Sequence, residues 1–295
     1  MPLVNARLVV TGAGGALGRR LVPRAVRAGW QVLALDTAPP AADSAGVTWR
    51  QVDVTSVGDL VAAFQGADAV VHLAAHPSPV GHSDHDVLSL NVGGTLAVLL
   101  AAEEAGVGRV ALASSVNATG AAYSAAPRYD WFPLDETHPS YSEDAYAVSK
   151  FLGEQAADAF ARRRPGAVLT SLRFHALREE FEASAQDADQ RKDLWGWVSF
   201  AAASAACLRA LGRQDGGHVV AYVVSARTVS PTATAELSAR FHPGVPWREE
   251  PRGNRSFYAT GLAARVLGWD AADDDPALSP AEGPRRCEPH GPSAV

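Results

Sequence analysis

The stretch Arg7–Gly18, RLVVTGAGGALG, joins a short apolar run to a cluster of glycines. Leu8–Val10 is apolar and contains two β-branched residues, which is typical of a buried strand. Arg19–Ala28 follows with apolar side chains at helical spacing, so we expect a strand, a glycine turn and a helix. Nucleotide phosphates bind at such turns, because the N–H groups and positive dipole end of the helix face the anion.

The glycines of this turn are spaced as Gly12, Gly15 and Gly18. The commoner G-x-G-x-x-G pattern is not met, since Leu17 stands where that pattern needs its last glycine. Gly14 is a fourth position without a side chain. Because glycine lets the backbone approach a pyrophosphate closely, we expect these glycines to bind a dinucleotide. The alternative is a turn that serves only strand–helix packing.

The chain has 295 residues, of which 47% are hydrophobic and 20% are charged. This length suits one large α/β domain, or one domain with a smaller lobe. We find no run of about 18 apolar residues and no signal-peptide pattern, so we expect neither a membrane span nor export. Cys207 and Cys287 give no disulfide framework, which favours a reducing cytoplasm. The net charge of −6 argues against nucleic acid as a partner, and we predict no metal site.

Lys150 and Lys192 are the two lysines among 26 Lys and Arg residues. This bias toward arginine, together with the many alanines, suggests a GC-rich bacterial genome. Each lysine that remains is therefore informative, because almost every other basic position holds arginine.

A second apolar run, Gln31–Leu35, ends at Asp36. An acidic side chain about 20 residues past the glycine turn accepts hydrogen bonds from ribose hydroxyls and repels the 2′-phosphate of NADP. Residues 37–40 offer no Arg or Lys to hold that phosphate, so we expect NAD rather than NADP. The alternative is that Asp36 only opens a turn before the prolines that follow.

Further apolar strands alternate with helices along the chain, which predicts a parallel, doubly wound α/β sheet. The expected strands are 47–52, 69–75, 109–113, 168–174 and 218–225. The expected helices are 59–64, 87–104, 146–163, 232–241 and 261–267, with another inside 195–211.

Ligands of such sheets bind beyond the carboxyl ends of the strands. There, Asp53 could reach an adenine amino group. The small residues at the end of the next strand would let the backbone lie close to a cofactor. These residues are Leu73, Ala74 and Ala75.

His76 and Ser78 follow the same strand and are candidate substrate contacts. His72, inside that strand, is interpreted as a core histidine rather than a catalyst. Asn91 lies on a mostly apolar helix and needs hydrogen-bond partners. It either holds a kink and water near the site or caps a neighbouring loop.

Ser115 ends the next strand, where a serine points into the crevice, and the loop Thr119–Tyr141 is expected to border the substrate. Tyr146 and Lys150 are four residues apart on an expected helix, so they share a face. A nearby ammonium favours the phenolate and lowers the pKa of the tyrosine, which would make Tyr146 a usable base. The alternative is an ordinary surface pair.

With these residues in place, the chain resembles the extended short-chain dehydrogenase/reductases, the NAD-dependent epimerase/dehydratase family. The likeness covers about residues 7–270 and rests on T-G-x-x-G-x-x-G combined with Y-x-x-x-K. It implies a Rossmann domain with a small C-terminal substrate lobe, NAD as cofactor, and a homodimer formed through two helices of each subunit.

The resemblance also implies roles for single residues. Ser115 corresponds to the catalytic Ser/Thr, Tyr146 to the catalytic base, and Lys150 to the partner that holds the nicotinamide ribose. The implied NAD-binding positions are Gly12, Gly15, Gly18, Asp36, Asp53 and Val54, and Asn91 corresponds to the family's helix asparagine.

The chain departs from the family at several positions. Val116-Asn117 stand where members that dehydrate nucleotide sugars carry an Asp-Glu pair, and His175 stands where many epimerases carry Asn. These differences and the short C-terminal lobe lean toward the compact uronate-dehydrogenase-like branch. Asn117 and His175 are then candidate substrate contacts. Arg191 falls near a carboxylate-binding arginine of that branch, and its alternative is an exposed loop charge.

We therefore expect an NAD-binding core at 1–175, a substrate lobe at 176–270 interleaved with the last core strands, and a disordered tail at 271–295. The charged segment 179–193 is expected to be mobile. The predicted activity is hydride transfer between NAD and a hydroxyl or carbonyl of a sugar, uronate or similar small molecule, with Tyr146 as base. A nucleotide-sugar epimerase with retained NAD and a dinucleotide sensor without turnover are the alternatives.

Overall fold

The structure, a computed structural model, describes residues 6–38 and 45–271. Seven parallel strands form its central sheet: β1 (Arg7–Thr11), β2 (Gln31–Asp36), β3 (Val47–Gln51), β4 (Ala69–His72), β5 (Arg109–Ser115), β6 (Val168–Phe174) and β9 (Gly217–Val223). Their order is β3-β2-β1-β4-β5-β6-β9. The strand order reverses between β1 and β4, and ligands of doubly wound sheets bind beside such a reversal.

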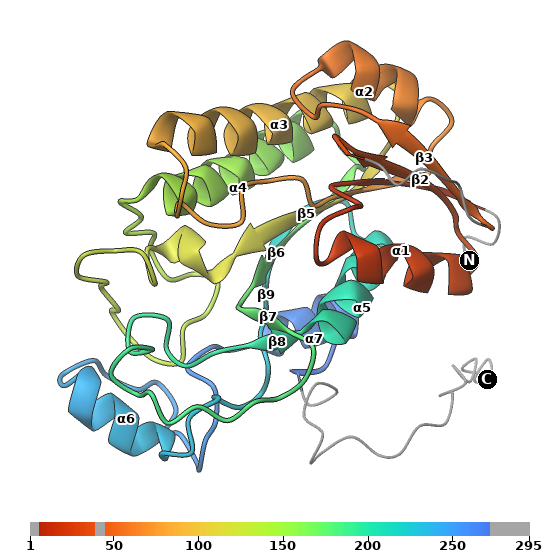
Figure 1. The fold of residues 1–295 in the computed structure, drawn as a ribbon. Coiled ribbons are helices and arrows are strands. Elements are labelled where there is room, and N and C mark those ends of the chain that lie inside the picture. The colour runs from red at the N-terminus through yellow and green to blue at the C-terminus, as the bar shows by residue number, and fades with distance from the viewer. Residues whose placement is uncertain (1–5, 39–44, 272–295) are drawn as a thin grey trace, which may run out of the picture.

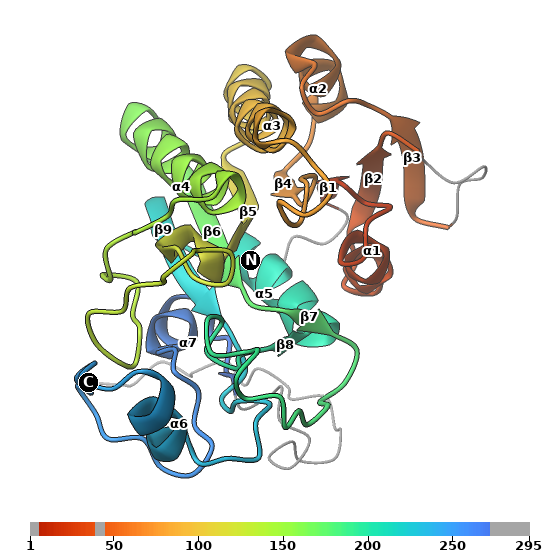
Figure 2. The same ribbon diagram turned by 60° about the vertical axis from the view of Figure 1, so that its left-hand side comes forward.

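Helices cover both faces of this sheet (Figure 1, Figure 2). One face carries α1 (Gly18–Arg27), α5 (Phe200–Leu211) and α7 (Gly261–Leu267), and the other carries α2 (Val57–Phe64), α3 (Asp84–Glu104) and α4 (Ala145–Arg163). Successive strand residues point to opposite faces, so Val10 and Val71 join one core while Val9 and Val70 join the other. The predicted α/β fold class is confirmed.

The glycine turn after β1 is packed so tightly that side chains would not fit. Gly12 has φ of +66°, and a Cβ there would lie 2.6 Å from the backbone nitrogen of Ala74. A Cβ on Gly18 would overlap the carbonyl oxygen of Gly12. The start of α1 therefore lies directly against the turn that follows β1, and that turn lies against the backbone of Leu73 and Ala74 after β4.

By length and composition, α3 is the one helix of the described residues that could cross a membrane. It instead packs between α2 and α4, with Val87 and Val98 fully buried. Its first turn begins at Asp84, earlier than expected, because the hydroxyl of Ser83 accepts a hydrogen bond from the N–H of Asp86 at 3.1 Å.

A smaller lobe lies beside the carboxyl ends of the strands (Figure 1). It contains α6 (Thr234–Phe241), the two-stranded pair β7 (Leu177–Arg178) and β8 (Val198–Ser199), and the nearby turn η1 (Val116–Thr119). Phe132, Trp195 and Phe257 are fully buried in the aromatic core of the lobe. Phe132 belongs to the loop 119–141, so that loop helps to build the lobe.

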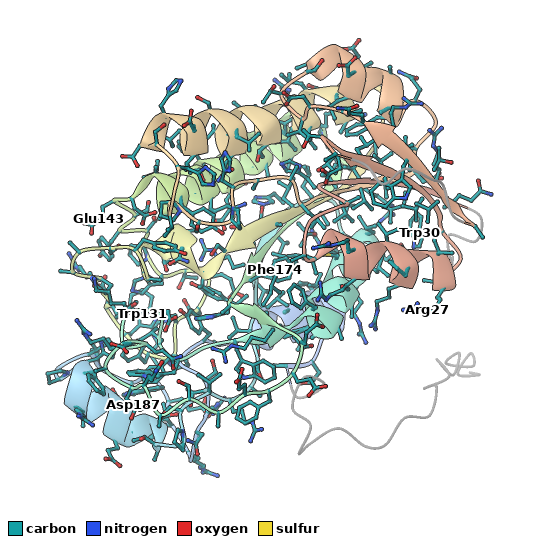
Figure 3. The ribbon with its side chains drawn as sticks, viewed as in Figure 1. Arg27, Trp30, Trp131, Glu143, Phe174 and Asp187 are labelled. Carbon is teal, nitrogen blue, oxygen red and sulfur yellow. The ribbon has the colours of Figure 1, made fainter. Side chains whose placement is uncertain are left out.

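The charged segment 179–193 is anchored, contrary to the mobility expected from its composition. The carboxylate of Asp187 accepts hydrogen bonds from the hydroxyls of Ser230, at 2.6 Å, and Thr232, at 2.9 Å. Its carbonyl accepts the indole N–H of Trp195 at 3.0 Å. Figure 3 shows Asp187 beside α6. These bonds join the segment to the lobe.

The structure differs from the expected elements in a few details. β4 ends at His72 rather than at residue 75, and the short pair β7 and β8 was not predicted, because two-residue strands show no periodicity. Residues 272–295 of the predicted tail lie outside the described residues. Ala271, the first residue of that tail, is buried in the core that contains α5 and α7.

Candidate active site

One cleft of about 580 Å³ joins the glycine turn to the three predicted catalytic residues. Ser115 ends β5, while Tyr146 and Lys150 lie one helical turn apart at the start of α4. That start is fixed by Asp144, whose carboxylate accepts a hydrogen bond from the N–H of Ala147 at 2.9 Å. The other predicted residues that line the cleft are Gly12, Gly15, Gly18, Leu73, Ala75, Asn117 and His175.

Tyr146 is buried, and burial raises the pKa of its phenol to about 12. A hydrogen bond with Ser115 opposes this rise in pKa, and the charge of Asp144 adds to it. The lowering of the pKa by Lys150 that the sequence suggested is not found in the protein alone. The Lys150 ammonium nitrogen lies 5.6 Å from the centre of the Tyr146 ring and donates to the carbonyl of Ala113 at 2.9 Å.

Lys150 is surrounded by protein, and burial lowers the pKa of its ammonium to about 8, with the carboxylate of Glu154 opposing the shift. With a pKa of about 8, Lys150 is still mostly an ammonium at neutral pH. With Ser115 and Tyr146 it forms a set that can hold and move one proton at a substrate oxygen.

A buried ion pair behind Lys150 was missed by the sequence reasoning. Arg173 of β6 binds Glu154 of α4 through two hydrogen bonds of 2.9 and 2.8 Å. Both side chains are nearly inaccessible. Glu154 also accepts the hydroxyl of Ser114 at 2.6 Å, and Arg173 donates to the Tyr222 hydroxyl at 3.2 Å. An arginine within an apolar strand, and an acid one turn after Lys150, were the signals available.

Asp36 lies at the glycine turn, as a ribose-binding acid should. Its carboxylate accepts the N–H of Gly14 at 2.9 Å and the N–H of Ala38 at 3.2 Å. A Cβ on Gly14 would lie 3.0 Å from the carboxylate, so a side chain at this position would push Asp36 away from the turn. Asp36 thus both shapes the turn after β2 and faces the glycines.

These residues fit NAD. The first turn of α1 has no acidic residue and no side-chain cap, so the positive end of the helix dipole can face a pyrophosphate. The glycines leave room for that pyrophosphate, and Asp36 supplies an acceptor for ribose hydroxyls.

Six predicted cofactor residues lie outside the lining of the cleft, namely Gly14, Asp36, Asp53, Val54, Ala74 and Asn91. The carboxylate of Asp53 accepts the N–H and hydroxyl of Thr55, at 2.9 and 2.8 Å, and these bonds lower its pKa. Val54 is buried and packs against Gly94. Ala74 does not line the cleft either but closes over Gly12. Binding of NAD by these residues stays a prediction.

Asn91 caps the loop after β4, which is one of its two predicted roles. Its side chain accepts the N–H of His76 at 2.8 Å and donates to the carbonyl of His76 at 3.1 Å. It also donates to the hydroxyl of Ser149 at 3.0 Å, which ties the loop to α4. The ring of His76 stacks on His82, with ring centres 3.8 Å apart, and does not line the cleft.

His72 is a core histidine. Its ring bonds the hydroxyls of Thr11, at 2.7 Å, and Thr95, at 3.3 Å, and burial lowers its pKa to about 3. Ser78 lies beside the cleft rather than in its lining, and its hydroxyl bonds Tyr123. Tyr123 itself lines the cleft and packs edge-on against Tyr146 at 6.0 Å between ring centres.

His175 lines the cleft, but its two ring nitrogens are held by the backbone. One bonds the carbonyl of Asp193 at 2.6 Å, and the other accepts the N–H of Ala176 at 2.7 Å. Burial lowers the pKa of His175, so it stays neutral. Arg191 is exposed, donates to the carbonyl of Ala188, and does not line the cleft. This exposed position agrees with the alternative of a loop charge, and contact with a substrate carboxylate stays a prediction.

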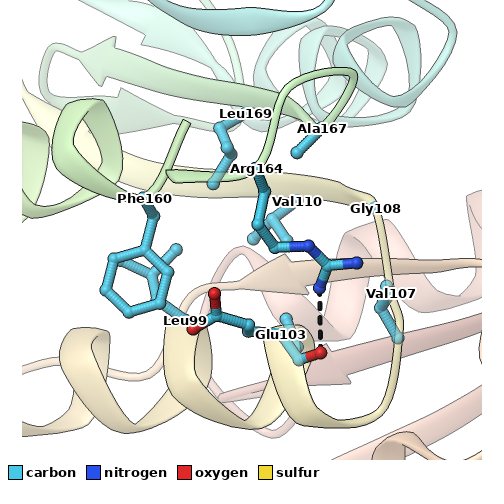
Figure 4. Close-up of a pocket in the computed structure, with 10 residues that line it drawn as sticks. Leu99, Glu103, Val107, Gly108, Val110, Phe160, Arg164, Ala167 and Leu169 are labelled. Atoms are coloured by element: carbon cyan, nitrogen blue, oxygen red, sulfur yellow. Dashed lines mark hydrogen bonds between the residues drawn. The ribbon is translucent and has the colours of Figure 1, made fainter. Parts of the chain in front are cut away.

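A second pocket, of about 20 Å³, lies at the opposite, amino-terminal edge of β5 and β6 (Figure 4). Arg164 closes it by donating to the carbonyl of Glu103 at 2.8 Å. Its volume is enough for about one water molecule. Within the described ranges, no cluster of three or more His, Cys, Asp or Glu side chains could hold a metal ion.

The fold and this cleft together define a Rossmann enzyme that binds a dinucleotide. The profile of the NAD dependent epimerase/dehydratase family matches residues 8–178, more than half of the chain. The chain therefore belongs to this family, the extended short-chain dehydrogenase/reductases, and NAD is its cofactor. The predicted family and cofactor are confirmed.

Two of the relatives of known name are sugar dehydrogenases. The chain is 27% identical to a uronate dehydrogenase of Pseudomonas syringae pv. tomato, over 92% of this chain and 90% of that protein. It is 33% identical to an L-arabinose 1-dehydrogenase (NAD(P)(+)) of Haloferax volcanii, over 54% of this chain and 62% of that protein.

Solved structures show the same fold. MoeE5 in complex with UDP-glucose and NAD matches with a TM-score of 0.67 and 24% identity, over 90% of this chain and 93% of that chain. A glucuronic acid dehydrogenase of Chromohalobacter salexigens matches with a TM-score of 0.67 and 20% identity, over 90% and 83% of the two chains.

Proposed function

We propose that this protein transfers a hydride between NAD and a hydroxyl-bearing carbon of a sugar or a similar small polar molecule. The observation that carries the proposal is the single cleft that unites the glycine turn with Ser115, Tyr146 and Lys150. A protein that only sensed the dinucleotide would not need these three side chains beside the cofactor site.

The positions of the three residues in the cleft support the following roles. In the oxidative direction, Tyr146 as phenolate takes the proton of the substrate hydroxyl, and Ser115 donates a hydrogen bond to the same oxygen. Bound NAD would supply the hydride acceptor needed to oxidise a C–OH group to C=O. Lys150 lines the same cleft and would hold the ribose beside that carbon.

The relatives support a sugar-like substrate, since an arabinose and a uronate dehydrogenase are both similar to this chain. The test is absorbance at the NADH band while aldoses, amino sugars, uronates and nucleotide sugars are added with NAD. Net NADH with a free sugar supports the proposal. Tightly held NAD, no net NADH and an inverted stereocentre in a nucleotide sugar would instead identify an epimerase.

We further propose that the protein works as a homodimer in the cytoplasm. Leu96 and Leu100 of α3 and Leu152 of α4 are large apolar side chains that are between 38% and 43% exposed on neighbouring helices. Burying these side chains against a second copy would remove apolar surface from water.

A further inference from the structure

The ionisable side chains that line the cleft differ in whether the protein already uses their polar atoms. Tyr146 and Lys150 belong to the proposed proton-transfer set. His175 is bound through both ring nitrogens. Tyr123 and Asp193 remain, and Asp193 is the one carboxylate in the lining. In the described part of the chain, Lys150 is the only Lys or Arg side chain in that lining.

The backbone around Asp193 is fixed by bonds from three directions. His175 bonds its carbonyl at 2.6 Å. The adjacent Lys192 donates to the carbonyl of Ser124 at 2.7 Å, and its own carbonyl accepts the hydroxyl of Tyr129 at 2.5 Å. These bonds connect β6, the loop 119–141 and the lobe at one point, so Asp193 has little freedom to leave the cleft.

The next two residues store strain at this point. Leu194 and Trp195 have φ of +57° and +53° and are fully buried. Residues other than glycine adopt this conformation at a cost in free energy, and they keep it only where their surroundings enforce it. Such strain concentrates at ligand sites. Here the strained residues directly follow Asp193, which lines the cleft.

The protein satisfies only part of the hydrogen-bonding capacity of the Asp193 carboxylate. One oxygen accepts the N–H of Trp195 at a long 3.3 Å, and no ion pair of Asp193 is found among the described residues. Burial raises the pKa of Asp193, and the nearby His175 and Arg178 oppose this rise. Arg178 lies on β7, donates to the carbonyl of Glu182, and does not line the cleft.

We propose that Asp193 is a specificity-determining residue that accepts hydrogen bonds from hydroxyl or ammonium groups of the substrate and excludes substrates that carry a carboxylate. This inference rests on the proposed function and narrows its substrate class to neutral or amine-bearing sugars. A buried carboxylate repels a second one, and Arg191 does not reach the cleft to offset the repulsion. The chain would thus differ in substrate from the uronate dehydrogenase to which it is similar.

The test compares an aldose, its amino sugar and its uronate as substrates of the full chain with NAD. For the wild type, we expect kcat/KM for the aldose or the amino sugar to exceed that for the uronate by at least about tenfold. An advantage of the amino sugar over the aldose would identify ammonium as the preferred donor, and the reverse would identify hydroxyl. In Asp193→Asn, the advantage over the uronate should shrink by about tenfold or more.

The matched control is Asp189→Asn, which removes the same charge from an exposed position of the same segment. Asp189→Asn should leave the ratio of kcat/KM for the aldose or amino sugar to kcat/KM for the uronate unchanged. Calorimetric binding of the three sugars to the Tyr146→Phe protein with NAD ranks them without turnover, which separates failure of this inference from failure of the proposed activity. A preference for the uronate, an unchanged ratio in Asp193→Asn, or no measurable binding of any of the three sugars would overturn the inference.

Discussion

Burial controls the charge of the histidines packed on the sheet. It lowers the pKa of His72 to about 3 and that of His218 to about 4. In the unfolded chain a histidine has a pKa of about 6.5, so the unfolded state binds more protons between pH 6.5 and the folded pKa. The free energy of unfolding is therefore highest above pH 6.5 and falls by about 1.4 kcal/mol per pH unit for each histidine as the pH drops.

We predict that His218→Asn reduces the slope of the unfolding free energy against pH between pH 6.5 and 4. Asparagine can keep a hydrogen bond to Ser171, which His218 bonds at 2.9 Å, without gaining a proton. Urea denaturation at several pH values measures the slope of unfolding free energy against pH. The exposed His85, replaced by Asn, is the control. Equal slopes in wild type and His218→Asn would refute this origin of the acid sensitivity.

Asp36 should decide the choice between NAD and NADP. Replacing it by serine removes the acceptor for the ribose hydroxyls and the charge that repels a 2′-phosphate. Loss of hydrogen bonds to a charged group corresponds to about tenfold weaker NAD binding or more. Fluorescence titration with each cofactor measures the ratio of the two dissociation constants. An unchanged ratio would show that Asp36 only shapes the turn.

At the scale of elements, α4 depends on the buried pair Glu154–Arg173. Glu154→Gln leaves the Arg173 charge buried without its partner, which typically costs about 3–5 kcal/mol. We expect a loss of that size in the free energy of unfolding, measured by urea denaturation. The matched control on the same helix is Asp158→Asn, which breaks the exposed pair with Arg162 and should cost less than about 1 kcal/mol. Similar losses in both variants would contradict the prediction.

The central elements could be predicted because their residues carry local signals. β1, α1 and β2 follow from apolar runs, glycines and a terminal acid that stand next to one another in the chain. β7 and β8 could not be predicted, because two-residue strands exist only through pairing across about twenty residues. The polar composition of segment 179–193 predicts a mobile loop. The hydrogen bonds of Asp187 that join it to the lobe could not be predicted, because their partners lie more than 40 positions away.

The candidate site likewise has residues that the sequence predicts and features that only the folded chain creates. Ser115, Tyr146 and Lys150 could be predicted from strand ends and a helical spacing. The rise of the Tyr146 pKa could not, since it follows from burial that only the folded chain creates. Asp193 was missed for a similar reason, because its place in the cleft depends on bonds from His175 and Lys192.

At the scale of the whole molecule, the exposed leucines of α3 and α4 predict that the protein forms a dimer through these two helices. Leu152→Glu should place a charge in the proposed interface and convert a dimer to monomers, because burying an unpaired charge is costly. Sedimentation velocity at several concentrations measures the change. Val80→Glu, at another exposed apolar position, is the control and should leave the dimer intact. A monomeric wild type would contradict the proposed assembly.

The central claim is that Tyr146 exchanges the proton during hydride transfer. The most direct measurement compares NADH formation by Tyr146→Phe and Tyr123→Phe, two phenols of the same cleft, with the sugar that the wild type oxidises. General base catalysis contributes about 10²–10⁴-fold, so Tyr146→Phe should lose turnover by that factor while still binding NAD. Tyr123→Phe should lose far less. Full turnover in Tyr146→Phe would contradict the account.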